Sequence, residues 1–307
     1  MENSSNNPTY RVKFDVKFDH PITAFALQIG GWFPLAFPSA PIILVDRNIV
    51  GMAKKIAASS KRHDVAANSW WFEFLNTPSY KLNPLLHAME GCMQQVPTLQ
   101  QFVDEFHEAS SNLAIAFPKA GQVMIAQEDF PAAYSLVTDM ASSYASEQQF
   151  LLEVVPLLAS KVATNAIKKI EAKILEAASH MVLGSSKLVV LAALSCLYES
   201  ADGSIPSIGR RLIKPKAVFG QAQAHNVISD LRALEFLIRV STINGPTAAF
   251  ATRDKYLTAF WCEIQASNIG GDGAKLKFNI RLTDKLFPRL GHGEREKLTA
   301  RLSAADF

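Results

Sequence analysis

The stretch that most constrains the fold is IILVD, residues 42 to 46, an almost continuous apolar run of strand length. Parallel strands that are covered on both faces have such runs, because neither face of the sheet meets water. The next residues, NIVGMAKKIAASSKR at 48 to 62, have the pattern of a helix. A buried strand that leads directly into a helix predicts an α/β fold with a mainly parallel central sheet.

This apolar run ends on a carboxylate, Asp46, and an amide, Asn48, follows two residues later. Desolvating a lone carboxylate costs several kcal/mol, so Asp46 needs a partner. That partner is either a cation from outside the chain or the start of the next helix, because an aspartate before a helix can accept its first N–H groups.

Besides the strand and helix at 42–62, the N-terminal half predicts one hairpin and three further helical stretches. YRVKFDVKF, at 10 to 18, alternates like a half-buried strand, and we expect it to pair with 22–29, so that residues 1–40 form a β-hairpin extension. Helices are expected from near Asn83, with Pro84 in the first position, and from 99 to 113. We also expect a long helix over 146–183. It begins with a capping box of Ser146 and Gln149, and Pro156 should kink or split it.

The C-terminal half combines helices with short strands. Residues 185–200 are a helix or a buried strand, since their pattern does not separate the two. A helix over 219–242 carries the buried stripe Val227, Leu231, Leu234 and Ile238, and a turn at 244–246 ends it. The remaining elements expected are a strand near 247–254, a helix at 255–266, a turn at 267–273 and a strand at 274–282.

Composition narrows the class of protein. With 307 residues, 49% of them apolar, the chain can bury a large core, and its apolar runs are shorter than the roughly 20 residues of a membrane span. Three widely separated cysteines without a CxxC pair indicate neither a disulfide framework nor a structural zinc site. We therefore expect a soluble globular protein of the reducing cytoplasm, with no membrane partner.

Two further carboxylates have contexts like that of Asp46. Asp254 ends the strand expected near 247–254, and open α/β folds bind ligands at the carboxyl ends of their strands. Asp230 lies about 60° from the centre of the buried helical stripe, and Asn226 faces the same way. Each acid also has an ordinary structural explanation: Asp254 could cap the next helix, and Asp230 could pair with Arg232 or Arg239.

Taken together, these segments resemble the PIN-domain nucleases. Family members have a first strand that ends in an aspartate, matched by Val45-Asp46-Arg47-Asn48, and a glutamate on an early helix, matched by Glu90. They have a third acid on a helix before the last core strand, matched by Asp230, and a Thr-x-Asp at that strand's end, matched by Thr252-Arg253-Asp254. This chain departs from the family in two ways: Arg47 stands where small polar residues are usual, and 140 residues separate Glu90 from Asp230.

The resemblance implies a three-layer α/β/α fold, with a PIN-like nuclease domain over 41–307 and a large helical insertion at about 97–185. It also implies a catalytic metal site of Asp46, Glu90, Asp230 and Asp254, with Asn48, Asn226 and Thr252 orienting ligands or waters. Glu73, Asp104 or Glu105 could replace Glu90. Four converging carboxylates raise one another's pKa unless a divalent cation neutralises them, and oxygen-only ligation suits Mg²⁺ or Mn²⁺.

The implied activity is metal-dependent hydrolysis of phosphodiester bonds, by an endoribonuclease in a toxin or phage-defence setting. Arg210, Arg211, Lys214 and Lys216 form a basic segment that could contact the substrate backbone or could be a solvated loop. The partner expected is a nucleic acid, RNA in preference to DNA, and a homo-oligomer or an inhibitory protein is compatible with the family. The alternative function is an inactive PIN-like module that binds RNA or protein through its helical insertion.

Overall fold

The computed structural model describes residues 22–29, 31–33, 38–58, 73–91, 95–183, 188–205, 207–244, 248–264, 267–270, 277–279 and 282–304. Its strands are β1 (Phe25–Gln28), β2 (Gly31–Phe33), β3 (Ile42–Val45), β4 (Lys81–Asn83), β5 (Gly121–Gln122), β6 (Ala248–Thr252), β7 (Ser267–Gly270) and β8 (Lys277–Asn279). The first six form one sheet in the order β2-β1-β6-β3-β4-β5, and β7 and β8 form a second, antiparallel pair.

The central sheet is mainly parallel, as the sequence predicts. β3 runs parallel to both β4 and β6, β4 runs parallel to β5, and β1 runs antiparallel to β2 and β6. In the register of β3 with β6, Val45 is opposite Ala251. Consequently Asp46, the residue after β3, lies beside Thr252, the last residue of β6.

Successive residues of the central strands enter two different cores. Ile43 and Val45 pack with α1 (Arg47–Ala58) and α4 (Leu99–Ala116), whereas Leu44 joins the larger core on the other face. The same alternation holds in β6, where Ala249 and Phe250 face opposite sides. Helices therefore cover both faces of the sheet, which explains why IILV has no polar position.

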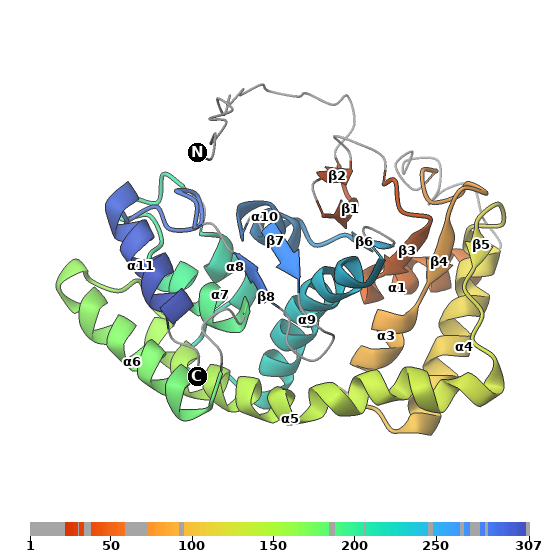
Figure 1. The fold of residues 1–307 in the computed structure, drawn as a ribbon, viewed down its shortest axis with the longest axis horizontal. Helices are drawn as coiled ribbons and strands as arrows, with labels where there is room; N and C mark the ends of the chain where they lie inside the picture. Colours follow the sequence, from red (N-terminus) through yellow and green to blue (C-terminus); the bar gives the residue numbers. More distant parts are fainter. Residues whose placement is uncertain are drawn as a thin grey trace, which may run out of the picture.

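The remaining α-helices are α3 (Leu85–Glu90), α5 (Phe130–Val154), α6 (Ile167–His180), α7 (Leu188–Leu197), α8 (Ile208–Ile213), α9 (Gln221–Asn244), α10 (Lys255–Ile264) and α11 (His292–Ala304), with 3-10 turns at Gln127–Asp129, Val155–Leu158 and Thr164–Ala166. In Figure 1, α5 runs along the lower edge of the molecule. It leads from α4, beside the sheet, to α6 at the end of the molecule away from the sheet. The long helix α9 crosses the middle and packs against α5, α7 and β6.

The helical insertion predicted at about 97–185 contains α4, α5 and α6. Within this range α4 packs on α1 and covers the sheet, so the part that extends away from the sheet begins after α4. The predicted break at Pro156 is confirmed, because α5 ends at Val154 and a 3-10 turn follows. The capping box predicted at Ser146 and Gln149 is wrong, since both residues lie inside α5, which begins at Phe130.

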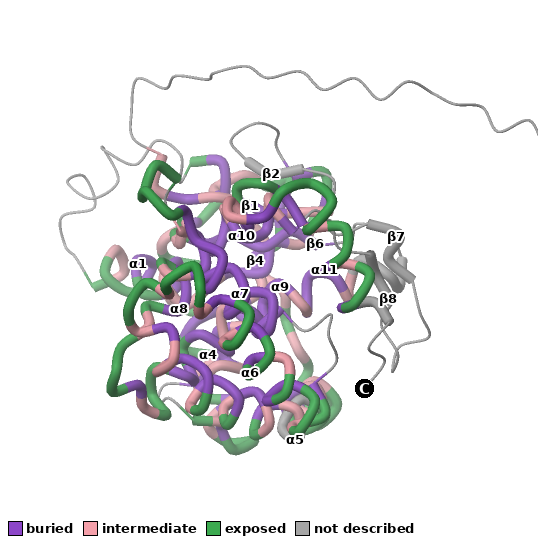
Figure 2. The backbone as a smooth tube through the Cα atoms, turned by 90° about the vertical axis from the view of Figure 1, so that its left-hand side faces the viewer, coloured by how far each residue is buried: buried purple, intermediate pink, exposed green. Residues whose placement is uncertain are grey.

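The structure decides one open alternative and confirms another prediction. Within the ambiguous segment 185–200, Leu188–Leu197 form a helix, α7, in which every residue is buried. The stripe of Val227, Leu231, Leu234 and Ile238 on α9 is buried in the larger core. Buried backbone gathers in the interior around β4, β6 and α9, and the exposed segments lie outside it (Figure 2).

One sequence prediction needs correction, and another lies outside the described residues. The turn predicted at 267–273 is wrong over Ser267–Gly270, which form β7. The strand predicted at 10–18 lies outside the described residues; 22–29 contains β1, which pairs with β2 and β6 and extends the central sheet. In the part of the chain that the structure describes, no helix is long and apolar enough to cross a membrane.

Candidate metal centre at the strand ends

Asp46 follows the last residue of β3 and lies at the start of α1. Its main chain continues the sheet through Asp46 N to Ala251 O, 2.9 Å, and its carbonyl accepts from Ile49 N and Val50 N. The side chain accepts from the hydroxyl of Thr252 at 2.6 Å, from the amide of Asn48 and from Arg47 N at 2.6 Å. The capping interpretation and the site interpretation of Asp46 are therefore compatible.

Asn48 connects the ends of β3 and β6. Its Nδ2 donates to Asp46 and, at 3.2 Å, to Thr252 Oγ1, while its Oδ1 accepts from Arg253 N at 2.9 Å. Thr252 in turn accepts from Asp254 N at 3.0 Å. The Thr-x-Asp segment is thus held against Asp46, and the role of Asn48 and Thr252 in orienting ligands or waters stays a prediction.

Asp254 caps α10. Its Oδ1 accepts from Tyr256 N at 2.7 Å and Leu257 N at 2.9 Å, which are first-turn donors without a partner inside the helix. The structural role considered from the sequence is therefore present. The cap uses Oδ1 of Asp254, and the charge of this carboxylate also acts on the carboxyls of Asp46 and Asp230.

Glu90 is the last residue of α3, and Gly91 fixes where this helix ends. Gly91 has φ +71, and a Cβ there would lie 3.0 Å from Gln95 O, so the position requires glycine. Asn83 supports the other end of α3, because its side chain accepts from Leu85 N at 3.0 Å. The carboxylate of Glu90 lies 3.2 Å from Arg47 Nη1 and is 16% exposed.

Asp230 reaches the same place from α9. It lines a pocket with Asp46 and Glu90, and among the described residues no hydrogen-bond donor contacts its carboxylate. Asn226, one helical turn earlier, is exposed, and the hydrogen bonds of the described residues do not link it to the acids. Its proposed role in orienting a ligand stays a prediction.

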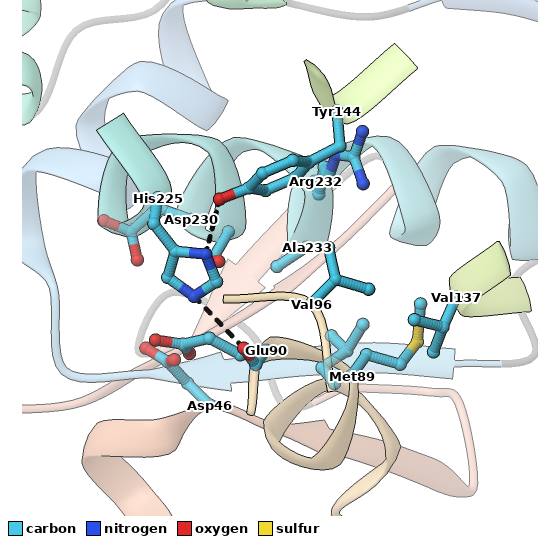
Figure 3. A pocket seen from close by; sticks show the side chains of 12 residues that line it. Asp46, Met89, Glu90, Val96, Val137, Tyr144, His225, Asp230, Arg232 and Ala233 are labelled. Atoms are coloured by element: carbon cyan, nitrogen blue, oxygen red, sulfur yellow. Dashed lines mark hydrogen bonds between the residues drawn. The ribbon is translucent and has the colours of Figure 1, made fainter. Parts of the chain in front are cut away.

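The pocket has an acidic end and an apolar end. Figure 3 shows Asp46, Glu90 and Asp230 gathered on one side, with Met89, Val96 and Val137 on the other. Its volume is about 50 Å³. At roughly 10–15 Å³ for each water, this space holds a few waters.

A hydrogen-bonded chain that the sequence did not indicate forms one wall of the pocket. His225 Nε2 is 3.1 Å from Glu90 O, and a carbonyl can only accept, so this nitrogen carries the proton. The other ring nitrogen, Nδ1, then accepts from the hydroxyl of Tyr144 at 2.5 Å (Figure 3). This arrangement makes His225 a neutral imidazole that holds the end of α3, and burial lowers its pKa.

The acids are difficult to ionise together. Burial, and then the charge of Asp254, raise the pKa of Asp46 to about 6 despite the hydrogen bonds to its carboxylate. Burial raises the pKa of Glu90 to about 7, with Asp46 adding to the shift and Arg47 opposing it. Burial and then Asp46, Asp254 and Glu90 raise the pKa of Asp230 well above its ordinary value, and Lys214 opposes this. Asp46, Asp254 and Glu90, the other three acids predicted from the sequence, therefore all act on Asp230.

As the side chains stand, no group of three or more His, Cys, Asp or Glu among the described residues is placed to hold a metal ion. Glu90 is bound by Arg47, and one oxygen of Asp254 accepts from the first turn of α10. The donor chemistry nevertheless suits a hard cation, because the ligands offered are carboxylate oxygens.

The alternative acids do not line the pocket. Glu105 binds His87 Nε2 at 3.0 Å, and Asp104 accepts from Gln100 at 2.8 Å, both on α4. Glu73 lies exposed in a turn. Of these candidates, Glu90 is the acid that faces the site.

The basic segment divides into one structural residue and three exposed ones. Arg210 binds Glu199 through two contacts of 2.7 and 2.8 Å and donates to Leu158 O, so its charge is neutralised inside the fold. Arg211, Lys214 and Lys216 are exposed. Arg211 lies over the ring of Tyr256, 5.9 Å from its centroid, on the same α10 turn that Asp254 caps.

Comparisons of this chain with protein-family models, with curated proteins and with solved structures give no match.

Proposed function

We propose that this protein is a divalent-metal-dependent nuclease of the PIN type that hydrolyses phosphodiester bonds in RNA. The observation that carries the proposal is the convergence of Asp46, Glu90 and Asp230 in one pocket, with the charge of Asp254 acting on it. These four residues come from the ends of β3, α3 and β6 and from the middle of α9. Isolated capping residues have no reason to share a pocket, whereas a metal centre requires it.

Carboxylates with raised pKa values support the choice of ligand. The four acids would hold Mg²⁺ or Mn²⁺, whose bound form supplies an activated water and stabilises the charge that develops on the phosphate. Within the chain, Asn48 and Thr252 position Asp46 through their hydrogen bonds. Tyr144 and His225 hold the end of α3, and with it Glu90, against the pocket.

Exposed cations beside the acidic end support a polyanionic substrate. Lys214 acts on Asp230, and Arg211 and Lys255 both lie over the ring of Tyr256. Exposed lysines and arginines bind phosphates and release counterions. The substrate backbone would lie across the mouth of the pocket, near these cations, whereas Arg210 contributes to the fold.

The test is a cleavage assay with labelled single-stranded RNA and DNA in Mn²⁺, in Mg²⁺ and in EDTA. We expect cleavage of RNA that needs the metal and falls at least about 100-fold in Asp230→Asn and Asp46→Asn, a loss typical of removing one electrostatic contact to the transition state. Asp139→Asn, an exposed carboxylate on α5, is the matched control and should cleave at the wild-type rate. Equal cleavage by Asp230→Asn and wild type would refute the assignment.

A second candidate function is an inactive PIN-like module that binds RNA or protein. The ion pair between Arg47 and Glu90 favours it, because an internal cation already neutralises one of the acids. Thermal unfolding with Mn²⁺ separates the two functions. A ligand that binds the folded state raises the midpoint, and an inactive module should show no shift.

A further inference from the structure

Tyr256 is the second residue of α10, and hydrogen bonds connect it to the acidic end of the pocket. Its main-chain N–H donates to Asp254 Oδ1 at 2.7 Å, and Asp254 N donates to Thr252 Oγ1 at 3.0 Å. The hydroxyl of Thr252 donates to Asp46, which lines the pocket, at 2.6 Å. These hydrogen bonds fix the start of α10, and with it Tyr256, relative to Asp46.

The ring of Tyr256 lies between two exposed cations and is itself partly exposed. Arg211 Cζ is 5.9 Å and Lys255 Nζ is 5.0 Å from the ring centroid. In the part of the chain that the structure describes, neither cation pairs with a carboxylate, whereas the preceding Arg210 is bound to Glu199 at 2.7 Å. The helices that carry these cations, α8 and α10, pack side by side (Figure 1). The fold therefore places two unpaired charges around one aromatic ring.

Sites for single-stranded nucleic acids combine cations that bind the phosphates with aromatic rings on which bases stack. We propose that Tyr256 stacks on one unpaired base of the substrate while Arg211 and Lys255 bind the phosphates on either side of it. This inference rests on the proposed function and adds that the substrate is single-stranded where it meets α10. In a duplex the bases are paired and stacked on one another, so the ring has no free base to contact.

Charge alone would also suit an acidic protein as the partner. The ring distinguishes the two partners, because the face of a tyrosine carries the negative part of its quadrupole and does not attract a carboxylate. Every base, in contrast, offers a π-face to the ring. The combination of ring and cations therefore favours a nucleic acid.

The experiment measures the binding of a short fluorescent RNA strand by anisotropy in EDTA, where a metal-dependent nuclease does not cleave. We expect Tyr256→Leu to bind this strand about 10-fold more weakly than wild type, and Tyr256→Phe and Tyr256→Trp, which keep a ring, to bind it like wild type. Three further ligands are an RNA duplex, a sugar-phosphate strand of the same length without bases, and poly-glutamate. Tyr256→Leu should bind each of these like wild type, because none presents an unpaired base.

The two cations are tested by the salt dependence of binding. Arg211→Ala and Lys255→Ala should each reduce the slope of log K against log salt for the single strand by about 0.7, the value expected for one lost phosphate contact. Lys173→Ala, which removes an exposed lysine on α6, is the matched control and should keep the wild-type affinity and slope. An unchanged slope in both Arg211→Ala and Lys255→Ala would overturn their role.

The outcomes separate this inference from the proposed function. Equal binding of the single strand by wild type and folded Tyr256→Leu would overturn the stacking role and leave the metal-dependent cleavage as it is. An equal loss on the strand without bases would also overturn it, because the ring would then act through the fold. Tighter binding of poly-glutamate than of RNA would identify an acidic protein as the partner. If wild type binds the strand through Tyr256 and does not cleave it with Mn²⁺, the inference stands and the nuclease activity is refuted.

The wild type alone gives a test that does not depend on the folding of Tyr256→Leu. It should bind the RNA strand about 10-fold more tightly than the strand without bases. Equal affinity for the two strands would show that only phosphates are bound and would overturn the inference.

Discussion

The cost of burying the Asp46 carboxylate, to which the charge of Asp254 adds, can be measured by replacing Asp46 with asparagine in metal-free protein. Its pKa is raised from 3.8 to about 6, and each unit corresponds to roughly 1.4 kcal/mol. Between these two values the folded state binds the proton more tightly than the unfolded chain, so wild-type stability falls as the pH rises. Above about pH 6 the Asp46 carboxylate is ionised in both states, and the stability lost by burying its charge reaches about 3 kcal/mol.

Asp46→Asn removes this penalty and keeps the shape of the side chain. We therefore expect the free energy of unfolding of the variant, minus that of the wild type, to increase by roughly 1–2 kcal/mol between pH 5 and pH 8. The pKa shifts of Glu90 and Asp230 act in the same direction, because both lose a neighbouring charge. The hydrogen bond from the Asn48 amide is weakened in the variant, but this loss does not depend on pH.

The assay is urea unfolding followed by circular dichroism at pH 5, 6, 7 and 8 with EDTA present. Taking the difference between variant and wild type cancels the titrating groups on which Asp46 does not act, such as His87, whose pKa burial lowers to about 4. Asp139→Asn is the control, and its difference from wild type should stay constant. If the difference between Asp46→Asn and wild type stayed constant from pH 5 to pH 8, or decreased, the reasoning would be refuted.

Two further substitutions test the parts of the fold that position Glu90. Gly91→Ala places a Cβ 3.0 Å from Gln95 O at φ +71, and we expect urea unfolding to show that the free energy of unfolding falls by about 1–3 kcal/mol. An unchanged midpoint would show that the end of α3 is not constrained. Tyr144→Phe leaves His225 Nδ1 buried without a donor, which should cost about 1–3 kcal/mol while the number of bound Mn²⁺ ions stays the same; a wild-type midpoint would argue against this hydrogen bond.

The sequence predicts the elements of this fold better than their contacts. IILVD indicates a buried parallel strand because both faces of β3 enter a core, and the stripe on α9 has a clear helical period. The start of α5 was missed, since Ser146 and Gln149 match a capping box although the helix begins at Phe130. Local capping patterns can occur inside a helix that packing extends further.

Within the candidate site, the sequence indicates the acids but not the groups that hold them. Asp46 and Asp254 can be found because each follows a strand, and Asp230 because it lies at the edge of an apolar stripe. The pairing of Tyr144 with His225, 81 positions apart, has no local pattern, and neither does the contact of Arg47 with Gly91, 44 positions apart. Such contacts depend on how whole helices pack.

Asp254 shows that a structural role and a role in the site can be separated within one carboxylate. Oδ1 caps α10, and the charge acts on the pocket. Asparagine is as good an N-cap as aspartate, so Asp254→Asn should keep the stability within a few tenths of a kcal/mol, whereas Asp254→Ala should lose about 1 kcal/mol. Both variants should bind Mn²⁺ more weakly and cleave RNA more slowly, because both remove the charge. If Asp254→Asn bound metal and cleaved RNA like wild type, the cap alone would account for this residue, and the metal site would be limited to Asp46, Glu90 and Asp230.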